Sequence, residues 1–319
     1  MNLWWHCKRW FQPEVGRVNL DPNRLISLDR QPEIEELMSS VGFSKPDRIL
    51  PLRSTNNEVY ELQYDHHFLV LKIDLNDTDS SLLYEDAVLR FLKKQRLPHP
   101  GVLRSGSTEE PKLTWLLMKQ EGYAMHFYRW IIPLLLYESG KLLANYHSVL
   151  FDENQQEEEG LTAGIRIDRL LPFDSWSNDL SKLIEQRVIS SGSAETILRK
   201  LKRVTEPPGR SLCHGEFTLP HILVKKKRVN CAIDWPSACW SCPASDLAIS
   251  EVYFRSIQYP FRYFLKGYRT MLSIDDYLAH RQEYMILAVI KRLRTSARVD
   301  QNDRFLKVLH QIIDGKHQP

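Results

Sequence analysis

Apolar and polar residues alternate along the first third of the chain in a pattern that predicts strands. The runs Val59–Tyr64 and Phe68–Ile73 change face at every residue and flank a short polar turn, which is typical of a β-hairpin. A second strand pair is expected at Val102–Arg104 and Lys112–Met118, on either side of a polar turn at Gly106–Glu110. These segments predict an antiparallel sheet.

Helical spacing dominates elsewhere. Apolar residues three and four positions apart predict a helix at Glu33–Val41, and a second one in the segment that starts at Glu85 and includes Leu92. Beyond residue 120 the pattern is almost entirely helical. Helices are expected within Ile132–Leu150, Leu247–Leu265 and Tyr277–Ile313, and two more within Ile165–Thr205.

One further hairpin interrupts the helical part and carries the candidate chemistry. Its apolar strands, Ile222–Val224 and Cys231–Ile233, flank a basic turn. Glu216 precedes the hairpin, His221 begins its first strand, and Asp234 follows its second strand, so the three side chains should meet at one end. Phosphoryl transfer needs such a cluster, with one group to accept a hydroxyl proton and others to hold a metal.

The order His214-Gly215-Glu216, His221, Ile233-Asp234-Trp235 and Asp246-Leu247-Ala248 resembles the catalytic segment of the aminoglycoside phosphotransferase and choline kinase superfamily. These are small-molecule relatives of protein kinases. The resemblance runs from about residue 50 to the end. It implies an α+β, protein-kinase-like, two-lobed fold: a leader at 1–48, a strand-rich N-lobe at 49–119, and a helical C-lobe at 120–319 with the catalytic loop and acceptor pocket.

By this resemblance Glu216 is the catalytic base, His221 and Asp234 are the metal ligands, and His214 and Asp246 support the loop. Two of these residues depart from the family, which usually has Asp and Asn where this chain has Glu216 and His221. Glutamate keeps the carboxylate but lengthens the side chain. Imidazole suits manganese or zinc better than magnesium, so His221 either favours another ion, leaves the metal to Asp234, binds phosphate, or only caps the loop.

The first strands carry the expected nucleotide site. Lys72 lies on a predicted strand and Glu85 follows thirteen positions later on a helix, which resembles the lysine–glutamate pair that positions phosphates in kinases. The segment Arg53–Tyr60 takes the place of the glycine-rich loop without containing a glycine. Lys119–Gly122 resembles the hinge that contacts adenine. Nucleotide-binding residues are therefore expected to be Lys72, Glu85, Ser54, Asn56 and Asn57.

Composition excludes several other classes of protein. Lys plus Arg is 43 and Asp plus Glu is 40, and the basic residues are dispersed, so no nucleic-acid binding is predicted. No apolar run reaches the roughly 20 residues of a membrane span. The five cysteines, an odd and unevenly spaced set, suit reduced thiols in a cytoplasm. Cys239 and Cys242 form a C-x-x-C pair, but two further zinc ligands are not evident nearby.

The leader contains Trp4, Trp5, Lys8 and Arg9 and lacks the apolar core of a signal peptide. These residues either lie at a membrane surface or dock on the protein itself.

The sequence thus predicts a cytoplasmic ATP-dependent kinase that transfers the γ-phosphate to a hydroxyl of a small molecule, with ATP and a magnesium or manganese ion as cofactors. The acceptor is an antibiotic, an amino alcohol or a sugar. The rival interpretation is a pseudoenzyme that retains nucleotide or partner binding. A protein kinase proper is disfavoured, because His214-Gly215-Glu216 and Ile233-Asp234-Trp235 depart from the H-R-D and D-F-G patterns.

Overall fold

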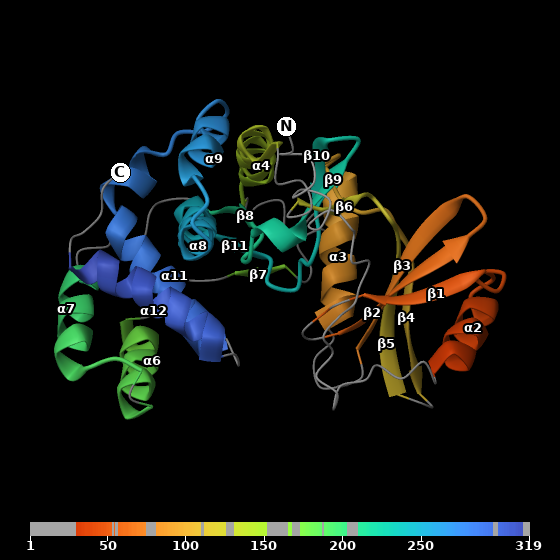
Figure 1. Cartoon of the computed structure of the whole chain (residues 1–319), viewed down its shortest axis with the longest axis horizontal. Coiled ribbons are helices and arrows are strands. Elements are labelled where there is room, and N and C mark those ends of the chain that lie inside the picture. The colour runs from red at the N-terminus through yellow and green to blue at the C-terminus, as the bar shows by residue number, and fades with distance from the viewer. Residues whose placement is uncertain are drawn as a thin grey trace, which may run out of the picture. The chain divides into compact units, whose positions relative to one another are not determined.

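An antiparallel sheet of five strands, in the order β1-β2-β3-β5-β4, organises the first part of the protein (Figure 1). In this computed structural model the described residues are 30–52, 54, 57–74, 81–109, 112–125, 131–151, 165–167, 173–186, 188–202, 210–295 and 299–314. The leader tryptophans and Asn56 lie outside them. Two compact units are distinguished, Met1–Asp86 with Pro100–Gln120, and Ala87–His99 with Glu121–Pro319.

The predicted first hairpin is confirmed in the first unit. Strand β2 (Glu58–Tyr64) pairs with β3 (His67–Asp74), and side chains of β2 alternate between buried and half-buried positions. Strand β1 (Arg48–Leu52) pairs on the other side of β2. Helix α2 (Gln31–Ser40) confirms the expected helix near residue 33, and it buries Ile34 and Met38 in the same apolar core as the sheet.

The second strand pair is longer than predicted. Strand β4 (Val102–Glu109) pairs with β5 (Lys112–Lys119) as far as Glu109, so the expected turn at Gly106–Glu110 is wrong over most of its length. A strand at the sheet edge tolerates polar residues because one side stays solvated. Gly106 lies against the Trp115 ring, where an added Cβ would come within 3.0 Å of the indole.

The predicted helix after the hairpin is confirmed as α3 (Ser81–Lys94), which begins in the first unit and continues into the second. Its residues Val88, Leu89 and Leu92 are fully buried. This spacing places Glu85 on the same apolar face.

The second unit is mainly helical, as predicted, but has more helices in its last third than the two expected stretches. One break between helices lies just before Phe261, where Pro260 stands. A proline nitrogen cannot donate a helical hydrogen bond, so a continuous helix is disfavoured there. The described helices are α4 (Ile132–His147), α6 (Phe173–Glu185), α7 (Ser191–Leu201), α8 (Pro243–Ser256), α9 (Phe261–Tyr268), α10 (Asp275–Ala279), α11 (Arg281–Thr295) and α12 (Val299–Ile313).

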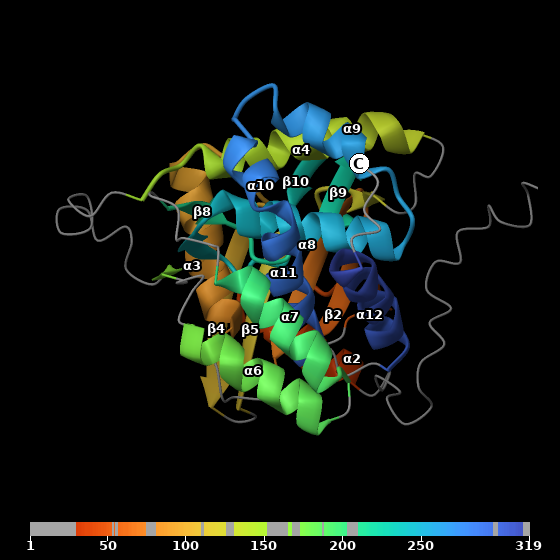
Figure 2. The ribbon, with the colours of Figure 1, turned by 90° about the vertical axis from the view of Figure 1, so that its left-hand side faces the viewer.

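Helix α11 is the centre of this helical group. It contacts α8, α12, α6 and α7 (Figure 2). Its residues Tyr284 to Ile290 are all buried. Helices α4 and α9 also contact each other closely, because each contributes a glycine. An added Cβ at Gly140 would collide with the carbonyl of Phe264, and one at Gly267 would collide with the carbonyl of Tyr137.

Two small sheets complete the second unit. The predicted hairpin is confirmed as β9 (Ile222–Lys225) and β10 (Arg228–Ala232), which join β6 (Tyr123–Ala124) in one sheet. Lys226 and Lys227 both have positive φ, as a two-residue hairpin turn requires. The other sheet consists of β7 (Arg166–Ile167), β11 (Cys239–Ser241) and β8 (Ser211–Cys213). None of the described helices is long and apolar enough to cross a membrane.

Candidate active site

The loop after β8 is held in place by the carboxylate of Asp246, in the first turn of α8. One oxygen accepts a hydrogen bond from the backbone N–H of His214 at 2.6 Å, and the other accepts from the N–H of Gly215 at 2.8 Å. Asp246 is fully buried. Burial alone would raise its pKa, but the hydrogen bond from His147 and these donors hold the pKa below its usual value.

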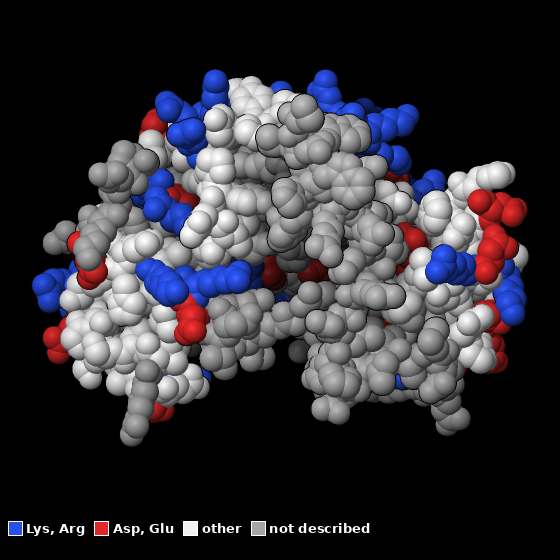
Figure 3. All heavy atoms as spheres, in the orientation of Figure 1, with Lys and Arg blue, Asp and Glu red and all other residues white. Residues whose placement is uncertain are grey.

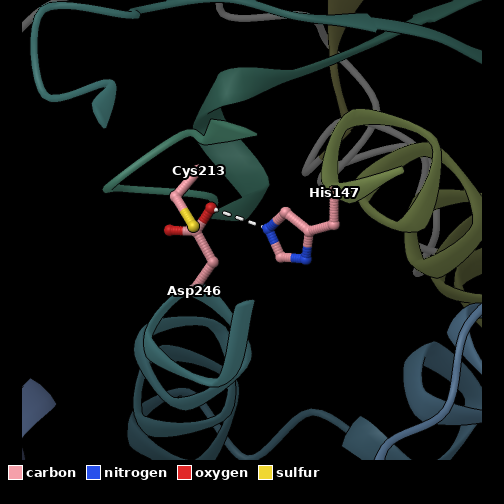
Figure 4. Close-up of side chains that lie close together, drawn as sticks. All are labelled: His147, Cys213 and Asp246. Carbon is pink, nitrogen blue, oxygen red and sulfur yellow. Dashed lines mark hydrogen bonds and ion pairs between the residues drawn. The ribbon is translucent and has the colours of Figure 1, made fainter. Parts of the chain in front are cut away.

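His147 extends this network to helix α9. Its Nε2 donates to Asp246 at 3.2 Å (Figure 4). Its Nδ1 lies 2.8 Å from the hydroxyl of Tyr268. The sequence predicted only a packed histidine at the end of a helix. The structure shows that this packing also orients the Asp246 carboxylate.

Cys213 lies close enough to His147 and Asp246 for the three to hold a metal ion by distance alone. The chemistry does not fit such a site. Both Asp246 oxygens already accept backbone hydrogen bonds. Burial and the charge of Asp246 also raise the pKa of the Cys213 thiol well above its usual value, so the thiolate that metals need is disfavoured. This cluster is structural.

Gly215 permits the sharp turn that follows. Its φ is +82°, in the left-handed region, and an added Cβ would collide with the backbone carbonyl of Ser237. The loop and the segment after β10 therefore approach each other too closely for any other residue at this position.

His214 is a neutral side chain. It is completely buried, and desolvation lowers its pKa to about 4. Its Nε2 donates to the carbonyl of Ile233 at 3.0 Å, which leaves Nδ1 to accept the backbone N–H of Glu216 at 3.3 Å. One imidazole thus fastens the loop to the end of the hairpin.

Glu216 is half-buried and forms an ion pair that the sequence did not predict. Its Oε1 accepts a hydrogen bond from Nη1 of Arg292, on α11, at 2.6 Å. Among the described residues no donor bonds to the other oxygen, Oε2. The Arg292 guanidinium also lies 6.0 Å above the Phe305 ring of α12. Within the described residues the carboxylate is therefore held at one oxygen alone.

His221 and Asp234 meet as the hairpin pattern predicted. Nδ1 of His221 donates to the carbonyl of Glu216 at 2.8 Å, and Nε2 lies 3.3 Å from Oδ2 of Asp234. A carbonyl only accepts, so Nδ1 must carry a proton. The Nε2 and Oδ2 atoms can share either a proton or a cation.

Asp234 has an unusual backbone. Its φ is +70°, which is uncommon for a residue other than glycine. Trp235 follows and is fully buried, with its Nε1 donating to the carbonyl of Ala232 at 3.0 Å. The buried tryptophan helps fix the turn that presents the Asp234 carboxylate, whose side chain is 36% exposed.

In the first unit, Lys72 and Glu85 form a buried ion pair. Nζ of Lys72 donates to both oxygens of Glu85, at 2.9 and 2.8 Å. Glu85 is fully buried and Lys72 is 6% exposed. Burying a charge is costly without a partner, so the pair explains how a strand lysine and a helix glutamate remain inside the unit.

The expected phosphate loop lies between β1 and β2. Ser54 is exposed and Asn57 is half-buried. The expected hinge, Lys119–Gly122, begins at the last residue of β5, and Gly122 has positive φ with the backbone of Val224 close by.

The C-x-x-C pair is structural in the described part of the chain. Cys239 belongs to β11 and faces Cys213 across the sheet, and Cys242 precedes α8. All are buried free thiols. Burial raises the pKa of Cys242 to about 11.

Sequence reasoning missed Arg292, which stands 76 positions after Glu216 in a helix with other basic residues. It also missed Tyr268. Neither residue belongs to a motif, so only the folded arrangement identifies them.

The strand-rich first unit with its buried Lys72–Glu85 pair, and the helical second unit with its Asp246-held loop, define a kinase-like α+β protein. The sequence matches the phosphotransferase enzyme family (APH) over residues 48–272, so the chain belongs to this family. None of the curated proteins matches it.

Solved structures of similar fold include aminoglycoside and macrolide phosphotransferases. A thermostable mutant of aminoglycoside phosphotransferase APH(4)-Ia, in ternary complex with AMP-PNP and hygromycin B, is 16% identical with a TM-score of 0.65, covering 90% of this chain and 99% of that chain. Macrolide 2'-phosphotransferase MphH from Brachybacterium faecium is 17% identical with a TM-score of 0.59, covering 91% and 100%. ADP-bound APH(2'')-Ib is 17% identical with a TM-score of 0.59, covering 88% and 98%. At these identities the likeness establishes the fold.

Proposed function

We propose that the protein transfers the γ-phosphate of ATP to a hydroxyl of a small molecule. The observation that carries this proposal is the Glu216 carboxylate, bonded among the described residues at Oε1 alone, beside the His221–Asp234 pair that bonds the Glu216 backbone carbonyl, in a chain of the phosphotransferase family. Residues 49–119 would serve as the N-lobe and residues 120–319 as the C-lobe with the acceptor pocket.

In this proposal Glu216 orients the acceptor. Its Oε2 accepts a hydrogen bond from the hydroxyl, whose oxygen forms a bond to the γ-phosphorus. The bond from that phosphorus to the β–γ bridging oxygen breaks, and ADP leaves. The hydroxyl proton passes to Glu216 and then to water. Because such transition states are loose, orientation contributes more than basicity, and a glutamate can fill this role.

Lys72 would hold the ATP phosphates, with Glu85 fixing its position. The pair is already formed at 2.8 Å, so the ammonium needs little reorganisation to meet a phosphate. Ser54, Asn56 and Asn57 would contribute hydroxyl and amide groups from the phosphate loop.

Asp234 and His221 would hold a divalent metal ion, which neutralises charge on the phosphates when bound. The donors fit, because Nδ1 of His221 is committed to the Glu216 carbonyl and leaves Nε2 facing the Asp234 carboxylate. A mixed nitrogen and oxygen pair suits manganese better than magnesium.

The proposal is tested by thermal stabilisation of the purified protein with ATP plus magnesium, ATP plus manganese, and ATP alone, together with ATP consumption. Stabilisation that requires metal, is stronger with manganese and is lost in Asp234→Ala supports the assignment. Normal turnover in Asp234→Ala would contradict the metal site.

Glutamate at 216 and histidine at 221 favour a second candidate, a pseudoenzyme that binds nucleotide or a partner without transfer. This second candidate would be supported if ATP stabilises the protein but is not consumed with any cationic, neutral or anionic acceptor.

A further inference from the structure

Arginines of α11 and α12 lie close to Glu216. Arg292 neutralises the carboxylate through a 2.6 Å hydrogen bond, and only 21% of its side chain is exposed. Arg304 is exposed on α12, next to Phe305, whose ring lies beneath the Arg292 guanidinium. Two arginines therefore border one carboxylate on this wall of the second unit.

Tyr253 of α8 lies near the same three charged groups, Arg292, Arg304 and Glu216. Burial raises the pKa of its phenol, and Glu216 adds to this effect, while Arg292 and Arg304 oppose it. Tyr253 must therefore lie within electrostatic range of both arginines and of Glu216. Figure 3 shows basic side chains on the surface over α11 and α12, with acidic ones beside them.

A cationic acceptor would meet an unfavourable field here. An aminoglycoside or an amino alcohol carries ammonium groups at neutral pH, and its hydroxyl would have to approach Glu216 beside the Arg292 guanidinium. The Glu216 carboxylate is already paired with Arg292 through one oxygen. An acceptor with its own carboxylate or phosphate would instead be attracted, and the planar guanidinium matches such groups.

We propose that the acceptor is an anionic hydroxyl compound, such as a sugar acid or a sugar phosphate, and that Arg292 and Arg304 bind its anionic group. This inference rests on the proposed function and deepens it. Arg292 thereby sets specificity as well as the position of Glu216.

The test uses calorimetry on the full chain saturated with AMP-PNP and manganese. Four probes are titrated: glucuronate, glucose 6-phosphate, glucose and glucosamine. The first two are anionic, the third is neutral and the fourth is cationic. Binding is compared in the wild type, Arg292→Gln and Arg304→Gln. Arg269→Gln, at an exposed position after α9, is the control with the same net charge.

At least one anionic probe should bind about tenfold or more tightly than glucose, and glucosamine more weakly than glucose, since a hydrogen bond to a charged group has an effect of this size. Arg292→Gln should remove the preference, Arg304→Gln should weaken it, and Arg269→Gln should leave it intact. Failure of both anionic probes to bind, equal binding of all four sugars, or a preference that survives in Arg292→Gln would overturn the inference. Failure of AMP-PNP itself to bind would instead refute the proposed function.

Discussion

Arg292 and Glu216 are joined by a 2.6 Å hydrogen bond. By the family resemblance an aspartate is expected where this chain has Glu216, and the longer glutamate side chain reaches Arg292 on α11. The extra methylene of glutamate, compared with aspartate, allows the carboxylate to reach the Arg292 guanidinium. An aspartate at this position would be too short to make the same contact.

We therefore expect Glu216→Asp to reduce turnover although it introduces the residue usual in the family. A displacement of about one ångström at a reacting group costs on the order of a hundredfold. The measurement is kcat for ATP consumption with a saturating acceptor. Glu195→Gln, an exposed change on α7, is the control. Turnover equal to or above that of the wild type would show that the Arg292 contact does not position the carboxylate.

His221→Asn should shift metal preference from manganese towards magnesium, because an amide oxygen replaces an imidazole nitrogen. The expected change in the ratio of half-saturating metal concentrations is about tenfold or more, measured by nucleotide-dependent thermal stabilisation. His66→Asn, in the exposed turn between β2 and β3, should leave the ratio unchanged. An unaltered ratio in His221→Asn would remove this residue from the metal site.

Lys72→Met should weaken ATP binding and also destabilise the protein. The fully buried Glu85 would lose this cation, a change that costs about 3–5 kcal/mol in comparable pairs. Urea unfolding and ATP titration measure the two effects separately. The double variant Lys72→Met with Glu85→Gln should recover stability but not ATP affinity, while Lys141→Met, exposed on α4, should affect neither. Normal ATP affinity in Lys72→Met would contradict the phosphate role.

Stability should fall as the pH decreases from about 6.5 towards 4. The pKa of His214 is lowered to about 4 in the folded protein, so the unfolded chain takes up the proton first and unfolding becomes easier over this window. The full effect is on the order of 3 kcal/mol, from 1.36 kcal/mol per pKa unit.

Urea unfolding at pH 7 and pH 4.5 measures this loss. His214→Gln should be less stable at pH 7 but should show a smaller further decrease, whereas His310→Gln, at an exposed position, should follow the wild type. The same decrease in His214→Gln as in the wild type would assign the acid sensitivity to other groups.

Local sequence patterns predicted the parts of the fold that depend on nearby residues. The alternation in β2 and β3 and the helical spacing of Val88, Leu89 and Leu92 reflect burial of one face, which sequence records directly. Lys72 and Glu85 were expected to act together because they resemble the lysine–glutamate pair of kinases. The structure brings them together at 2.8 Å.

Contacts between distant segments were not predictable in this way. Arg292 lies among basic residues whose helical pattern suits a solvated face, and its pairing depends on how α11 crosses the loop after β8. The short strands β8 and β11 have three residues each, too few for a period to be recognised. Polar residues near Gly106 predicted a turn, since a sequence does not reveal that a strand lies at a sheet edge.

The two glycines at the contact of α4 and α9 limit which substitutions this protein tolerates. Gly267 precedes Tyr268, whose hydroxyl meets His147 at the end of α4, and His147 in turn meets Asp246. A methyl group added at Gly140 or Gly267 would separate the helices and pull this chain of contacts away from the loop that carries Glu216. Loss of function in random mutagenesis should therefore concentrate at these glycines as well as at the charged residues of the site.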